Sequence, residues 1–262
     1  MEFGMPTLIE NKNLEENVAL CKELGLQFVE LNMNFPMYQI PQLEETERLK
    51  KLARENGIYF TVHLDENLNV CDFNPLVADA YMETIERALK VAEEIGAPLL
   101  NMHMNHGIYV TLPDRKVRLF GEYREPYMAA MHGFREMCEK TAGDSGVKVC
   151  IENTDGYQDF EREAIDYLLE SEMFALTWDI GHSHACGNVD EAFLMERRDR
   201  LYHFHIHDAK GTANHQTLGF GEIDLAQRLG LAETNGCRCV VETKTVEALR
   251  HSVEWLVSNG YK

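Results

Sequence analysis

Histidine, glutamate or aspartate ends each of six short apolar segments in this 262-residue chain. Imidazole and carboxylate groups are the usual protein ligands of divalent metal ions. In a parallel barrel all strands finish on one rim, so ligands at the strand ends meet there. The pattern therefore predicts metal chemistry at one end of a parallel barrel. The six segments are Tyr59–His63, Leu99–His103, Val149–Glu152, Leu176–Asp179, Leu201–His205 and Cys239–Glu242.

Side-chain alternation places the titratable residues of these segments on one face. Neighbouring side chains of a strand point to opposite faces, so Asp179 is expected inside the barrel and Trp178 outside. Charged groups inside a closed barrel are costly without partners, and several together call for a cation. A mostly oxygen ligand set suits Mn²⁺, Mg²⁺ or Co²⁺, although Zn²⁺ also fits. The expected ligands are Glu152, Asp179, His205 and Glu242.

Further histidines favour zinc, or more than one metal ion. For any single histidine, the commoner alternative is a hydrogen-bonded structural role. His207 stands between these two interpretations. The histidines assigned to a second metal or to substrate are His63, His103, His182 and His215. Those assigned a structural role are His106, His132, His184, His203 and His251.

The elements that would position these residues alternate between strand and helix eight times. Eight such units in about 250 residues predict an α/β protein with one (β/α)8 TIM barrel over residues 1–262. Strands are expected at Glu2–Leu8, Phe28–Asn32, Tyr59–His63, Leu99–Met104, Lys148–Asn153, Ala175–Asp179, Leu201–His207 and Arg238–Glu242. Periodicity of 3.6 residues predicts helices at Leu14–Leu24, Leu43–Asn56, Ala78–Ile95, Tyr123–Ala142, Glu161–Ser171, Asp190–Asp199, Leu225–Asn235 and Thr245–Ser258.

Two long connections leave the rim that carries the ligands. Leu64–Val77 follows the third strand and Asn105–Glu122 follows the fourth. Loops of this length in a compact domain usually bind ligands or cover a site. We therefore expect their polar side chains to bond to a hydroxyl-rich ligand; these are Asp65, Glu66, Asn67, Asn69, Tyr109, Thr111 and Arg115.

Composition limits the function classes. The net charge of −19, from 44 acidic against 25 basic residues, opposes binding to nucleic acid. No apolar segment approaches the roughly 18 residues that a membrane helix needs. The N-terminus has neither a basic region nor an apolar signal segment, and the seven cysteines contain no CxxC pair. We expect a cytoplasmic protein with reduced thiols and no membrane contact. The sequence does not decide whether the protein forms homo-oligomers.

Four sequence motifs resemble the xylose isomerase-like TIM-barrel superfamily. That superfamily contains sugar isomerases and epimerases, and also endonuclease IV-type nucleases that cleave abasic DNA. The resemblance covers essentially the whole chain, and it is specific for the superfamily but weak for the reaction. The motifs are Glu152-Asn-Thr, Asp179-Ile-Gly-His182, His205-Ile-His-Asp-Ala-Lys210 and His215-Gln-Thr-Leu-Gly-Phe-Gly-Glu222-Ile.

The resemblance implies roles for the ligand residues. Glu152, Asp179, His205 and Glu242 match the shared metal quartet. His63 and His103 match the pair that binds a second zinc in the nuclease branch. His182 and His215 match two of the three ligands of that branch's third zinc. Ala213 stands where the nuclease branch has an aspartate, and the first-strand nuclease signature is also absent, so the sugar branch is favoured.

The resemblance therefore implies a metal-dependent isomerase or epimerase of a sugar or sugar phosphate. Glu152 and Glu242 would be the catalytic base and acid, acting through a metal-stabilised enediolate. His182 would hold a substrate hydroxyl and Lys210 would neutralise developing charge. The alternatives are an endonuclease IV-like zinc phosphodiesterase, a non-catalytic sugar-binding barrel, and other metal chemistry such as polyol dehydration. The sequence leaves open which sugar, which metal and which oligomer.

Overall fold

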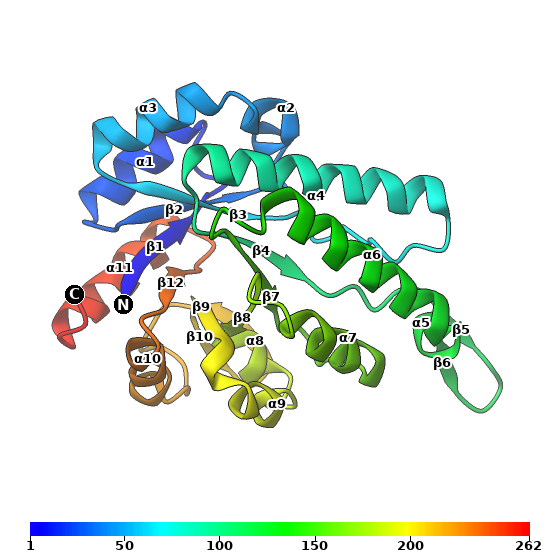
Figure 1. Cartoon of the computed structure of the whole chain (residues 1–262). Coiled ribbons are helices and arrows are strands. Elements are labelled where there is room, and N and C mark those ends of the chain that lie inside the picture. Colours follow the sequence, from blue (N-terminus) through cyan, green and yellow to red (C-terminus); the bar gives the residue numbers. More distant parts are fainter.

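In the computed structural model, which describes all 262 residues, eight parallel strands close into a barrel (Figure 1). The fold is the predicted (β/α)8 TIM barrel. Around the barrel the strands follow the order β1-β12-β9-β8-β7-β4-β3-β2. Their bounds are β1 (Glu2–Pro6), β2 (Phe28–Asn32), β3 (Tyr59–His63), β4 (Leu99–His103), β7 (Lys148–Glu152), β8 (Phe174–Asp179), β9 (Leu201–Ile206) and β12 (Arg238–Val241).

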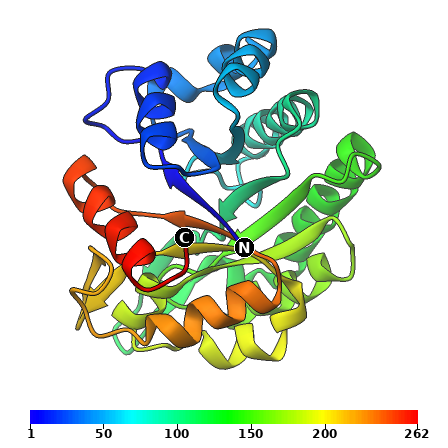
Figure 2. The same cartoon turned by 90° about the vertical axis from the view of Figure 1, so that its left-hand side faces the viewer.

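Helices surround the barrel as an outer layer (Figures 1 and 2). Side chains of Asn13, Asn74 and Thr245 accept backbone N–H groups in the first turns of three helices. Gly57 and Gly96 adopt the left-handed conformation that ends a helix. The main helices are α1 (Leu14–Glu23), α3 (Thr46–Asn56), α4 (Pro75–Ile95), α6 (Arg124–Ala142), α7 (Asp159–Leu169), α9 (Glu191–Glu196), α10 (Leu225–Thr234) and α11 (Val246–Ser258).

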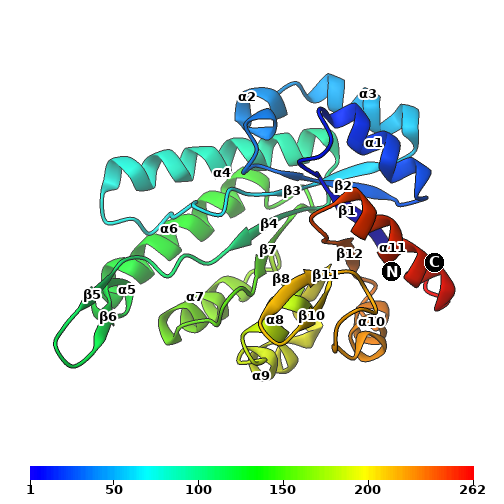
Figure 3. The same cartoon turned by 180° about the vertical axis from the view of Figure 1, so that it is seen from behind.

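The connections contain structure that the sequence pattern does not predict. A β5–β6 hairpin (Tyr109–Thr111 and Lys116–Arg118) projects from the connection after β4 (Figure 3). A second hairpin, β10–β11 (Asp208–Lys210 and Ala213–Gln216), follows β9 beside the short helix α8 (Ile180–Ala185). The remaining short helices are α2 (Ile40–Leu43), α5 (Leu119–Glu122) and two 3-10 turns at Pro36–Tyr38 and Arg198–Arg200.

The two faces of the barrel strands differ in character. Outward-facing side chains such as Trp178 and Phe204 belong to an apolar core between strands and helices. Toward the cavity the barrel interior is polar, and hydrogen bonds there join strands that are not neighbours in the sheet. Its buried polar members include Glu30, Thr61, Asn101, Thr177 and His203. Farther from the cavity, Leu99, Cys150 and Ala175 form a small apolar cluster. No helix of the protein is both long and apolar enough to cross a membrane.

Candidate metal and active site

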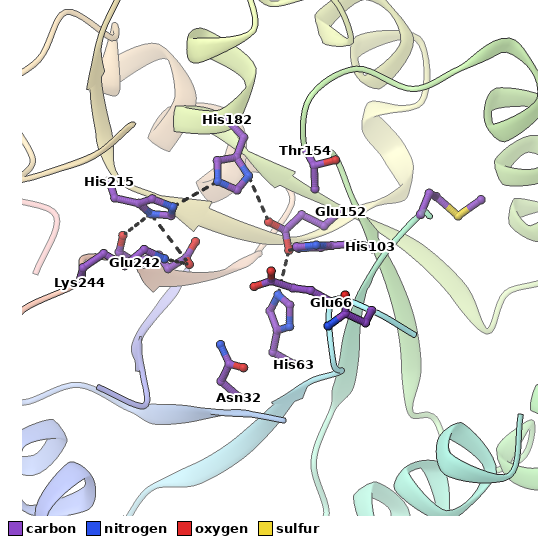
Figure 4. A pocket seen from close by; sticks show the side chains of 12 residues that line it. Asn32, His63, Glu66, His103, Glu152, Thr154, His182, His215, Glu242 and Lys244 are labelled. Carbon is purple, nitrogen blue, oxygen red and sulfur yellow. Dashed lines mark hydrogen bonds and ion pairs between the residues drawn. The ribbon is translucent and has the colours of Figure 1, made fainter. Parts of the chain in front are cut away.

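A cavity of about 490 Å³ opens at the end of the barrel where the strands finish (Figure 4). Met104 is its only apolar lining residue. A polar cavity of this size suits a small ligand that is bound through hydrogen bonds or a cation. The polar lining residues are Asn32, His63, Glu66, Asn67, His103, Glu152, Thr154, His182, His215, Glu242 and Lys244.

The four residues expected as metal ligands converge at the base of this cavity. Each offers one ligand atom, and these atoms lie within 4.8 Å of one another. His205 is central, because its Nδ1 lies 3.2 Å from Glu152 Oε1, 3.2 Å from Glu242 Oε2 and 3.9 Å from Asp179 Oδ2. Strands β7, β8 and β9 and the residue after β12 thus aim one side chain each at a common point.

The donor atoms at this point fit a cation. His205 Nε2 lies 2.8 Å from a carboxylate oxygen of Glu30, so that nitrogen carries a proton and Nδ1 faces the other carboxylates. His205 Nδ1 and Glu242 Oε2 are buried without a hydrogen-bond partner. Such a ring nitrogen between two carboxylates needs a positive charge, which a proton or a divalent metal ion supplies. Three carboxylates and one imidazole therefore fit a divalent metal ion.

Electrostatics inside the barrel follow from these contacts. Burial alone would raise the pKa of Glu152, but the neighbouring His205 and His103 hold it well below its usual range. Burial also opposes protonation of His63, yet the Glu152 carboxylate raises the pKa of His63 to about 9. Glu152 is therefore ionised, and its carboxylate favours positive charge on His63 and His205 by raising the pKa of each ring.

Two further histidines approach Glu152 from the other side. His63 Nε2 and His103 Nε2 lie 3.4 Å and 3.2 Å from Glu152 Oε2. His63 Nδ1 donates to the carbonyl of Leu64 at 2.7 Å, which leaves Nε2 directed at the cavity. His103 Nε2 is buried without a hydrogen bond. This pair can bind a second cation or a substrate oxygen.

His182 and His215 form a second pair on the opposite edge. Their Nε2 atoms lie 3.3 Å apart, and His215 Nδ1 donates to the carbonyl of Glu242 at 3.2 Å. Burial lowers the pKa of His215 to about 4, so this ring is neutral. His182 then donates from Nε2 to His215, and its unpartnered Nδ1 faces Asp179 and Glu152 at 3.5 Å and 3.9 Å. That nitrogen is placed to accept a substrate hydroxyl.

The structure brings most of the residues selected from sequence into one site. Asp179 and His205 lie buried behind the cavity wall, and six other selected residues line it: His63, His103, Glu152, His182, His215 and Glu242. Lys210 is exposed and does not line the cavity, whereas Lys244 does and lies 3.1 Å from Glu242 Oε1. Among the polar loop residues, Glu66 and Asn67 reach the cavity. The others do not: Asp65, Asn69, Tyr109, Thr111 and Arg115.

Sequence reasoning missed Asn32, Lys244 and Glu30. Asn32 ends β2, so the strand-end pattern that selected the ligands could have found it. Lys244 lies two residues after Glu242 and follows the same strand. Glu30 is a lone carboxylate inside an apolar strand, on the same face as Asn32, and that placement was its only signal.

Comparison with known proteins adds relatives and structural neighbours. The family model described as "Xylose isomerase-like TIM barrel" matches residues 18–259. The protein MJ1614 of Methanocaldococcus jannaschii is 22% identical over 95% of each chain. A D-tagatose 3-epimerase-like protein has a TM-score of 0.79 at 21% identity, over 98% of this chain and 96% of its own. The 3-keto-D-glucoside 4-epimerase YcjR of E. coli has a TM-score of 0.76 at 18% identity, over 98% of this chain and 99% of its own.

Proposed function

Because the chain belongs to the xylose isomerase-like TIM barrel family, we propose that it is a metal-dependent sugar isomerase or epimerase. The observation that carries this proposal is the pair Glu152 and Glu242, which approach His205 Nδ1 at the same distance of 3.2 Å. Two carboxylates beside one cavity can serve as base and acid on a carbon between them. The names of the two epimerase neighbours support the same reaction class.

In this proposal the chain moves one proton. Glu152, which is ionised, accepts the proton from a carbon next to the substrate carbonyl, and Glu242 in its protonated form returns one. A divalent cation held by Glu152, Asp179, His205 and Glu242 supplies positive charge that stabilises the developing negative charge on substrate oxygens. His182 Nδ1 orients a substrate hydroxyl, and Asn32 and Asn67 offer further hydrogen bonds.

The charge of the cavity favours a neutral polyol over a polyanion. Glu66, Glu152 and Glu242 line it, and Lys244 is the only lysine or arginine among the lining residues. A nuclease of abasic DNA would need several cationic groups against the phosphates. The histidine pairs do favour the zinc phosphodiesterase as a second candidate, because His63, His103, His182 and His215 surround Glu152 and Glu242.

The decisive experiment is proton exchange. In D₂O with Mn²⁺ or Co²⁺, the protein should incorporate deuterium at a carbon of one ketose in a panel of free and phosphorylated sugars. Glu152→Gln should abolish this incorporation, because an amide cannot accept the proton. Calorimetry of Mn²⁺ binding to Glu152→Gln separates loss of the base from loss of the metal.

The same preparation should be given an abasic DNA duplex. No exchange with any sugar, together with cleavage that falls steeply as salt is added, would refute the sugar proposal. That result would instead support the zinc phosphodiesterase.

A further inference from the structure

We propose that His207 is a positioning residue that fixes Asp179 with one ring nitrogen and the backbone of His215 with the other. The inference rests on the proposed function only in taking Asp179 as a metal ligand and His215 as part of the substrate cavity. His207 itself is fully buried and does not line the cavity. It therefore acts through its two neighbours.

The contacts of His207 define which nitrogen carries the proton. Its Nδ1 accepts the backbone N–H of His215 at 2.8 Å. Its Nε2 lies 3.0 Å from both carboxylate oxygens of Asp179. The carbonyl of Asp208 also lies 3.4 Å from Nδ1, at the long limit of a hydrogen bond, whereas the N–H of His215 is much closer. A proton on Nδ1 would point at that N–H, so the proton sits on Nε2 and is donated to Asp179.

With this proton position His207 is not a metal ligand. His182, His207 and His215 place three ring nitrogens within 4.8 Å, which is close enough for a three-histidine metal site. Both nitrogens of His207 are already engaged, however, so the ring has no free lone pair for a metal ion. The geometry points to a bridge between two parts of the site rather than to a ligand.

The Asp179 side of the bridge restrains a metal ligand. Asp179 Oδ1 also accepts the backbone N–H of His182 at 2.6 Å. With His207 on the same carboxylate, the group has little rotational freedom and one oxygen stays directed toward His205. Hydrogen bonds of this kind to metal-binding carboxylates typically change metal affinity 10- to 100-fold.

The His215 side restrains a strained segment. His215 has a φ of +52°, in the left-handed region that residues other than glycine rarely adopt. Its N–H bond to His207 helps to hold this conformation, and the two rings stack with centroids 4.1 Å apart. The β10–β11 hairpin therefore presents His215 to His182 at the cavity edge.

The test uses two substitutions that each keep one half of the bridge. In His207→Asn the amide oxygen lies near the position of Nδ1 and can still accept from His215, but Asp179 is released. In His207→Gln the amide nitrogen reaches the position of Nε2 and can still donate to Asp179, but the His215 N–H loses its acceptor. The measurements are Mn²⁺ affinity by calorimetry and hydrogen exchange of residues 213–216.

We expect the two variants to respond oppositely. His207→Asn should weaken Mn²⁺ binding at least about 10-fold while exchange in the hairpin stays slow. His207→Gln should keep Mn²⁺ affinity within about 3-fold while the His215 amide exchanges at least about 10-fold faster. Equal effects of both variants on both measurements, or no effect of either, would overturn the proposal. Neither measurement needs turnover, so a protein inactive on every sugar could still pass this test.

A measurement on the unmodified protein covers the case in which a variant fails to fold. Nitrogen-15 NMR of the histidine rings distinguishes the two neutral tautomers and the cation. We expect His207 to be neutral with its proton on Nε2. A proton on Nδ1 would contradict the bridge directly.

Discussion

Glu30 Oε1 lies 2.8 Å from Nε2 of His205, inside the barrel and behind the cavity. The other oxygen of Glu30 accepts from Thr61 Oγ1 at 2.9 Å and lies 3.1 Å from His203 Nε2. Burial alone would raise the pKa of Glu30, but His205 and His203 hold it well below its usual range. An ionised Glu30 therefore fixes the His205 ring with Nδ1 toward Glu152, Asp179 and Glu242.

Glu30→Gln should weaken binding of Mn²⁺ or Co²⁺ about 10- to 100-fold, because an amide no longer fixes the His205 tautomer by charge. Isothermal titration of the metal into wild type and variant measures this. Glu247→Gln, on the exposed face of α11, is the control and should bind metal as wild type does. Unchanged metal affinity in Glu30→Gln would show that Glu30 stabilises the barrel interior without affecting the metal site.

The ligand residues at the strand ends could be predicted from the sequence, but the buried residues that hold them in place could not. Apolar segments that end in a ligand residue show where strands finish, and a barrel turns those positions into one site. Glu30 and His207 act through partners that sequence spacing does not connect. Glu30 contacts residues 173 and 175 positions away, and His207 contacts residues 28 and 8 positions away. The left-handed turn at His215 likewise depends on contacts made only in the closed barrel.

Lys244→Ala should raise KM for the substrate more than Lys210→Ala does. Lys244 lines the cavity and lies 3.1 Å from Glu242, whereas Lys210 is exposed outside it. Steady-state kinetics on the sugar found by deuterium exchange compares the two variants under equal conditions. A larger effect of Lys210→Ala would mean that the β10–β11 hairpin moves over the cavity when substrate binds.

Gly181→Ala should destabilise the protein by about 1–3 kcal/mol, as overpacked core sites do. A methyl group at Gly181 would overlap the ring of His207, so either the ring or helix α8 must move. Gly133→Ala in the middle of α6 meets no atom within 4 Å and should instead stabilise by up to about 1 kcal/mol. Urea unfolding of both variants measures the contrast, and equal stability of both would contradict it.

His106→Gln should destabilise the protein at pH 6 and have less effect as the pH rises. His106, in the connection after β4, contacts two acidic residues that follow β7. Its Nδ1 lies 2.7 Å from buried Glu161 in α7, and its Nε2 lies 2.6 Å from Asp155 in the loop before that helix. The hydrogen bond to Glu161 raises the pKa of His106 to about 9, despite burial, with help from Asp155. Its unfolded pKa is about 6.5, so the stabilisation is complete below pH 6.5 and is lost as the pH passes 9.

The size of this effect is about 1–2 kcal/mol, because Asp155 is 73% exposed and solvent screens its share of the interaction. Urea unfolding of wild type and His106→Gln is measured at about pH 6.0, 7.5 and 9.5, which span the titration of His106. Each pair of curves gives the difference in unfolding free energy at that pH. His251→Gln on the exposed face of α11 provides a matched control for loss of a histidine. A wild-type advantage that stays constant from pH 6 to above 9 would mean that His106 stabilises the two connections as a neutral ring, without the charge assigned to it.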